Sequence, residues 1–325
     1  MTFAEYEAKC RMVQAWMYEN RQKGQTPNSF SPFVEPGRNV LETGEVRLND
    51  IAYGTEYPNS FFDLWYPDDK NEKRPTFVYI HGGGFLFGDK TSGDPLAAGT
   101  SGNEKLISIV RAGFNLVNVN YALAPDYRFP VQVKQIDELM RYLILHAEEL
   151  HLDMRHVALS GGSAGADITE IYGACVVNPE YAAALGIQPV MTEDTLRVLA
   201  IDEAALDSRT FCDTENMMAM LMTWIGDVGT AYEGTHLLLN AKEHIRDHFI
   251  PSWINTSNQE KYFVCEALDL AEKLKQIGCA HDLVYFPADQ AALPHGYMDE
   301  MASNPLAREA FDRMIAFVRE HISVK

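Results

Sequence analysis

The chain has 325 residues, of which 46% are hydrophobic and 22% are charged, a composition typical of a soluble globular protein. Its formal net charge of −19 argues against nucleic acid or an anionic membrane surface as the main partner. Its apolar runs are too short for a membrane span, and its first residues lack a signal-peptide pattern.

The five cysteines are odd in number and widely spaced, and they form no CxxC pair. The sequence therefore predicts neither a zinc site nor a disulfide framework, and we expect a cytoplasmic protein. His244 and His248 are four residues apart and could share a helix face, but a third metal ligand is missing nearby, so we expect no metal. The cysteines are Cys10, Cys175, Cys212, Cys265 and Cys279.

Strand-like and helix-like segments alternate along most of the chain. This alternation predicts a single α/β domain over residues 1–325, with a mainly parallel central sheet and helices on both of its faces. The predicted strands are 46–53, 60–66, 77–80, 115–121, 156–160, 196–201, 252–256 and 282–286; the predicted helices are 3–22, one through 136–143, one ending near 177, 264–277 and 306–322.

The segment 208–249 interrupts this alternation. It is rich in methionine and carries Trp224, which indicates a helical insertion outside the sheet. We expect the insertion and residues 1–40 to form a helical cap.

A tight turn is predicted where the strand 156–160 meets the following helix. The turn carries a Gly-x-Ser-x-Gly pattern in which Ser163 is flanked by Gly161 and Gly165. A serine at such a turn takes up a positive φ, and small residues two positions away let strand and helix pack closely. This placement holds the hydroxyl clear of its neighbours, as a nucleophile requires.

Four motifs occur in a fixed order: His81-Gly-Gly-Gly-Phe85, Tyr121-Ala-Leu-Ala-Pro-Asp126, Gly161-Gly-Ser-Ala-Gly165 and His295-Gly-Tyr297. Each is weak alone, but the ordered set resembles the hormone-sensitive-lipase-like branch of the α/β-hydrolases. The resemblance covers roughly residues 60–320. It implies an α/β-hydrolase fold and a carboxylesterase activity.

Within that resemblance, Ser163 is the expected nucleophile and His295 the expected base. The backbone N–H groups of Gly83, Gly84 and Ala164 would form the oxyanion hole. A plain turn needs one or two glycines, so three in succession after a buried strand favour this functional interpretation.

The acidic member of the triad is predicted less directly. In the family it follows the strand after the cap, and the corresponding loop here, 258–262, offers only Glu260. The family mostly uses aspartate there, so the glutamate is a departure, although either carboxylate can orient an imidazole. Asp202, at the end of the preceding strand, is the alternative.

The substrate pocket is predicted to involve Phe85 and Phe87 beside the glycine run, with Met218 and Met222 from the insertion. Methionine adapts to varied apolar shapes, so the two methionines suit an acyl pocket and a packed core equally well. The phenylalanines could equally pack beneath the pocket.

These features predict a serine hydrolase that cleaves a small-molecule carboxylic ester through an acyl-serine intermediate, without a cofactor. An amide-directed relative, such as an arylformamidase-like or peptidase-like hydrolase, would carry the same nucleophile and oxyanion hole. A non-catalytic ligand-binding homologue of the same fold is a further alternative. The oligomeric state is left open, a homo-oligomer included.

Overall fold

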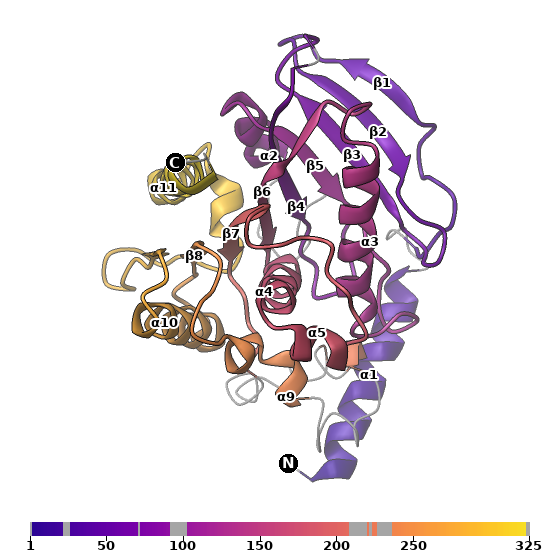
Figure 1. Cartoon of the computed structure of the whole chain (residues 1–325). Helices are drawn as coiled ribbons and strands as arrows, with labels where there is room; N and C mark the ends of the chain where they lie inside the picture. The colour runs from indigo at the N-terminus through magenta and orange to yellow at the C-terminus, as the bar shows by residue number, and fades with distance from the viewer. Residues whose placement is uncertain are drawn as a thin grey trace.

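The computed structural model describes residues 2–21, 27–70, 72–91, 103–207, 220, 223–225 and 236–322. Within these residues the chain builds one nine-stranded sheet in the order β1-β2-β3-β5-β4-β6-β7-β8-β9 (Figure 1). Its strands are β1 (Gly37–Val40), β2 (Val46–Ala52), β3 (Phe61–Tyr66), β4 (Arg74–Ile80), β5 (Asn115–Val119), β6 (Leu152–Gly162), β7 (Leu196–Asp202), β8 (Ser252–Asn255) and β9 (His281–Val284).

Strands β5, β4, β6, β7, β8 and β9 run parallel, and β1, β2 and β3 add an antiparallel edge. The central strands are apolar runs because helices cover both of their faces. All residues of β5 and the last five of β4 are buried. The predicted α/β class and mainly parallel sheet are confirmed.

Helices α3, α4 and α10 cover one face of this sheet, and α2 and α11 cover the other (Figure 1). Two apolar cores therefore sandwich the strands. The helices and 3₁₀ turns are α1 (Phe3–Arg21), α2 (Asn103–Arg111), α3 (Val131–Leu145), α4 (Ala164–Val177), α5 (Pro179–Ala184), α9 (His236–Leu239), η2 (Ala241–His244), α10 (Lys261–Gln276), η3 (Tyr297–Glu300) and α11 (Pro305–Ile322).

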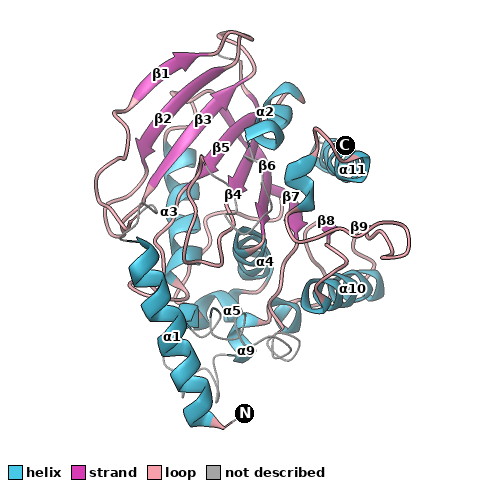
Figure 2. Cartoon of the chain, turned by 180° about the vertical axis from the view of Figure 1, so that it is seen from behind, coloured by secondary structure: helices cyan, strands magenta, loops and turns pink. Residues whose placement is uncertain are grey.

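Helix α1 leads away from the sheet, with the N-terminus at its far end (Figure 2). Cys10 of this helix is buried against the core. Most of the predicted insertion, 208–249, lies outside the described residues. Among the helices that the structure describes, none is long and apolar enough to cross a bilayer.

Candidate active site

Ser163 stands at the turn between β6 and α4, with φ 55° and ψ −124°. Its N–H donates to the carbonyl of Asp202 at the end of β7 (2.8 Å), so the turn is tied to the neighbouring strand. A Cβ on Gly165 would collide with the carbonyl of Ile80, and one on Gly161 with the carbonyl of Gly165. Only glycine therefore permits this close approach of helix and strand, which explains the Gly-x-Ser-x-Gly spacing.

His295 reaches this serine from the loop between β9 and η3. Its Nε2 lies 3.0 Å from Oγ of Ser163, within hydrogen-bond distance. Asn258 holds the loop: its amide donates to the carbonyls of Phe286 and Ala291 (2.8 Å each) and accepts from the N–H of Leu293 (2.9 Å). The imidazole is thus placed by a loop that the half-buried Asn258 holds closed.

The carboxylate beside the imidazole belongs to Glu203. Its Oε2 lies 2.7 Å from Nδ1 of His295 and accepts a hydrogen bond from the N–H of Gly296 (2.7 Å). Glu203 directly follows β7 and has φ 65°, and its own N–H donates to the carbonyl of Asn255 (2.9 Å). A glutamate with a left-handed backbone conformation costs roughly 1–3 kcal/mol of stability, which the surrounding hydrogen bonds must offset. Such backbone strain is often found at functional sites.

The structure does not place Glu260 in this position. Its Oε2 accepts from Oγ of Ser257 (3.1 Å), and its backbone caps the start of α10. The alternative, Asp202, accepts from the amide of Asn255 (2.7 Å). The carboxylate on the imidazole is instead one residue further along, because the left-handed turn after β7 redirects the chain. Asp202 and Glu203 form an acidic pair at the end of β7, the strand that pairs with β6 of the nucleophile. This pair is the sequence signal that leads to Glu203.

The glycine run after β4 is held by its carbonyl groups. Tyr121 Oη donates to the carbonyls of His81 (3.0 Å) and Gly82 (3.2 Å), and the carbonyl of Gly83 accepts from the N–H groups of Leu86 and Phe87 (3.0 Å each). The N–H and C=O of one peptide point in opposite directions. The carbonyls of Gly82 and Gly83 make these contacts, so the N–H groups of Gly83 and Gly84, which share their peptides, face away from them.

Backbone angles along this run are unusual. Gly83, Gly84 and Phe85 all have positive φ, at 108°, 58° and 65°. At the elbow, the carbonyl of Ser163 accepts from the N–H of Ala166 (2.8 Å), which leaves the N–H of Ala164 among the first donors of α4. The predicted oxyanion donors therefore lie on two rigid turns.

The aromatic side chains next to the glycine run pack against other aromatic rings. Phe85 stacks on Trp224 of the insertion (centroids 3.4 Å apart), and Phe87 meets Trp16 of α1 edge-on (5.6 Å). The indole N–H of Trp224 donates to Oε1 of Gln132 (2.8 Å). Both phenylalanines are buried, and each joins the glycine loop to one predicted cap element.

The two pocket methionines, Met218 and Met222, lie outside the described residues. Met220 is described, and its methyl group lies over Gly84, where it occupies the space that a Cβ on that glycine would need. A methionine of the insertion thus borders the predicted oxyanion loop.

Buried acids support the loop that follows Glu203. Asp167 accepts from the N–H of Ala205 (2.6 Å), and Glu266 accepts from the N–H of Asp207 (2.9 Å) while pairing with Lys242 (2.8 Å). Burial raises the pKa of Asp167 well above its ordinary value. The segment that carries the candidate acid is therefore held by two carboxyl side chains from α4 and α10.

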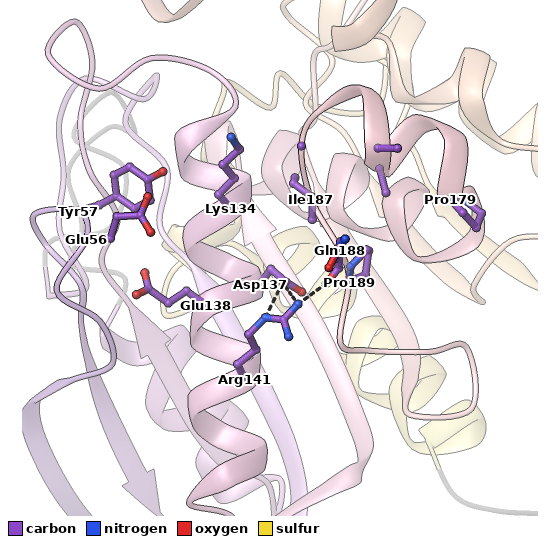
Figure 3. A pocket seen from close by; sticks show the side chains of 13 residues that line it. Glu56, Tyr57, Lys134, Asp137, Glu138, Arg141, Pro179, Ile187, Gln188 and Pro189 are labelled. Atoms are coloured by element: carbon purple, nitrogen blue, oxygen red, sulfur yellow. Dashed lines mark hydrogen bonds and ion pairs between the residues drawn. The ribbon is translucent and has the colours of Figure 1, made fainter.

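A separate hollow of about 820 Å³ lies between α3 and the segment around α5 (Figure 3). Arg141 pairs with Asp137 one turn away on α3 and donates to the carbonyl of Gln188, and Glu56 and Glu138 also line the hollow. The residues that line it include none of the predicted site residues. We therefore do not assign it to the active site.

The mainly parallel sheet and the strand-to-helix elbow give the chain an α/β-hydrolase fold. The family description BD-FAE matches residues 62–228, slightly more than half of the chain. The chain belongs to the BD-FAE family.

Two curated relatives and one solved structure illustrate the similarity. Esterase LipI of Mycobacterium tuberculosis is 30% identical over 129 residues, covering 39% of this chain and 38% of the relative. Acetyl esterase of Salmonella typhi is 27% identical over 115 residues, covering 35% and 32%. The chain thus matches about a third of the length of these relatives. Esterase B of Lactobacillus rhamnosis has the same fold, with a TM-score of 0.73, 19% identity, and coverage of 98% and 97%.

Proposed function

We propose that the chain hydrolyses small-molecule carboxylic esters through an acyl-serine intermediate. The observation that carries the proposal is the continuous contact from Ser163 Oγ to His295 Nε2 (3.0 Å) and from His295 Nδ1 to Glu203 (2.7 Å). Nucleophile, base and orienting carboxylate in this arrangement form the constellation of acyl transfer. Its members occur in the chain order serine, acid, histidine.

In the first half of the reaction, His295 Nε2 takes the proton of Ser163 as Oγ attacks the ester carbonyl. The negative charge that develops on the carbonyl oxygen is stabilised by the N–H groups of Gly83, Gly84 and Ala164. The tetrahedral intermediate collapses, the C–O bond breaks, and the alcohol leaves with the proton from His295. Glu203 holds the imidazole in the required tautomer and stabilises its positive charge.

In the second half, His295 takes a proton from water, and the hydroxide attacks the acyl carbon on Ser163. The serine leaves with the proton, and the carboxylic acid is released. The three oxyanion donors act again, because the same oxygen carries the charge. The protein supplies every group in this cycle.

We further propose that helix α1 and the insertion 208–249 form a cap over the site of a single-domain enzyme. The contacts of Trp16 with Phe87 and of Trp224 with Phe85 support this arrangement. The four cysteines in the described part of the chain are free thiols, which supports a cytoplasmic location. Because one relative is named an acetyl esterase, acetyl esters are the first substrates to test.

The test compares wild type with Ser163→Ala on p-nitrophenyl acetate, butyrate and octanoate, and on formanilide. We expect ester turnover by wild type and a loss of several orders of magnitude in Ser163→Ala. Labelling with a fluorophosphonate, followed by peptide mapping, should place the adduct on Ser163. Faster turnover of formanilide than of any ester would favour the amide-directed alternative, and an unlabelled, inactive wild type would favour a binding protein.

A further inference from the structure

A buried cluster of charged side chains lies next to the elbow, against Gly162. Lys105 of α2 places its Nζ 2.7 Å from Asp299 Oδ1 and 3.6 Å from Asp202 Oδ2, and over the ring of Tyr79 (5.1 Å to the centroid). Lys105, Asp202 and Asp299 are each less than a tenth exposed. A charge so deeply buried is retained only when it is paired.

Both aspartates of the cluster are close in sequence to a member of the candidate triad. Asp202 precedes Glu203, and its carbonyl accepts the N–H of Ser163. Asp299 lies in η3, four residues after His295. Through these two aspartates the cluster is connected to the segments that carry Ser163, Glu203 and His295.

Neutral hydrogen bonds extend the same connection. Asn255 at the end of β8 donates to Asp202 Oδ1 (2.7 Å) and accepts from Tyr297 Oη (2.6 Å), and its carbonyl accepts the N–H of Glu203. A Cβ on Gly162 would lie 3.2 Å from Tyr79 Oη and 3.7 Å from Asp202 Oδ2. The backbone next to the nucleophile thus rests directly on the cluster.

Resting on the function proposed above, we propose that Lys105 is a positioning residue: its ammonium group joins Asp202 to Asp299 and so sets the separation between Ser163, Glu203 and His295. It contacts no reacting atom. Burial opposes its charge, but Asp299, Tyr79 and Asp202 outweigh burial and raise the pKa of Lys105 well above its ordinary value. The ammonium group of Lys105 is therefore positively charged in the folded protein at ordinary pH.

The test is Lys105→Met, which keeps most of the side-chain volume and removes the cation. A displacement of about 1 Å among reacting groups costs roughly a hundredfold in rate, so we expect kcat to fall about ten- to a hundredfold. We expect KM to change less than about twofold, because the cluster does not face the substrate. Fluorophosphonate labelling of Ser163 should slow by the same factor as kcat.

The matched control is Lys90→Met. Lys90 is also a buried lysine between two buried aspartates, 3.1 Å from Asp50 and 3.0 Å from Asp63, but this cluster lies under β2 and β3. We expect a similar loss of stability, with kcat within about threefold of wild type. An equal fall of kcat in both variants would overturn the positioning role.

If Lys105→Met does not fold, Asp299→Asn is the second variant that tests the positioning role. It leaves Lys105 paired with Asp202. We expect it to lower kcat at least about threefold with KM unchanged. Wild-type kcat in Asp299→Asn, or in folded Lys105→Met, would contradict the inference. An inactive and unlabelled wild type would instead contradict the esterase function itself.

Discussion

The ring of Phe263 lies parallel to the imidazole of His295, with 4.4 Å between the centroids and 13° between the planes. Phe263 is buried on α10, which also begins directly after Glu260. A catalytic imidazole must keep one edge on the serine and the other on the acid, and a flat neighbour restricts its rotation. The stacking contact therefore contributes to the geometry of the base.

We expect Phe263→Leu to lower kcat by about tenfold, since leucine fills the space but does not hold the ring plane. Phe317→Leu is the control, because Phe317 stacks on His321 in α11 (4.2 Å) in a similar way. Steady-state kinetics on p-nitrophenyl acetate, with circular dichroism to verify folding, decide the result. Equal kcat values in the two variants would argue against a role for the stacking.

Substitution of each candidate acid, Glu203 or Glu260, gives a second prediction. Glu203→Gln removes the charge beside Nδ1 of His295 and should lower kcat by roughly two to four orders of magnitude. Glu260→Gln, which alters a carboxylate bonded to Ser257, should remain within about threefold of wild type. The reverse ranking of the two variants would restore Glu260 as the acid.

The position of Met220 over Gly84 predicts an effect on acyl length. Shortening this side chain opens space beside the oxyanion loop, and each methylene that the space accepts is worth about 1–3 kcal/mol. We expect Met220→Ala to raise the ratio of kcat/KM on octanoate to that on acetate by at least about tenfold. Met314→Ala, on the buried face of α11, controls for loss of core packing. An unchanged ratio would remove Met220 from the acyl pocket.

Glu170 predicts the pH dependence of stability. It is fully buried, and neither of its oxygens has a hydrogen-bond partner among the residues that the structure describes. Burial, with Glu266 adding to it, raises its pKa well above its ordinary value. A raised carboxyl pKa means that the folded state binds the proton more tightly than the unfolded state. Stability is therefore intact at pH values below the ordinary pKa of about 4.5 and falls as pH rises toward the folded-state pKa.

Asp167 and Asp202 act in the same direction, since burial raises both pKa values, that of Asp202 to about 6. Glu170→Gln removes one ionisation while keeping the shape. We expect the variant to gain stability relative to wild type at pH 8 and to show no gain at pH 4.5, as measured by urea unfolding. The exposed Glu320→Gln should show neither effect. A gain that is equal at both pH values would contradict the linkage.

Much of this architecture follows from local patterns. Apolar runs predict the central strands because burial on both faces imposes them, and the glycines around Ser163 predict the elbow because a tight turn excludes other residues. Strand β1 carries no such signal: all four of its residues are exposed, and it is held by pairing with β2. Helix α2 spans only nine residues, a short segment for a helix prediction, and Lys105 within it is an ordinary lysine until the fold buries it.

The acid could not be predicted from spacing for a related reason. Glu203 and Glu260 each follow a parallel strand, and the ends of such strands meet at one edge of the sheet. What separates them is the positive φ of Glu203 and the bond from Gly296, both of which arise only after the strands are assembled. Ser163 and His295 are identifiable because their motifs are themselves unusual.

The candidate acid, directly after β7, precedes the insertion in the chain, and β8, the strand that follows the insertion, contributes supporting groups such as Asn255. Ser163 and Glu203 therefore come from adjacent strands β6 and β7, with both positions determined before the chain enters residue 208. Under the cap proposed above, the insertion and the nucleophile–acid pair lie in separate stretches, and the base His295 follows the insertion. The insertion could be replaced by a segment of different length or shape, giving enzymes that share one reaction centre and accept different esters.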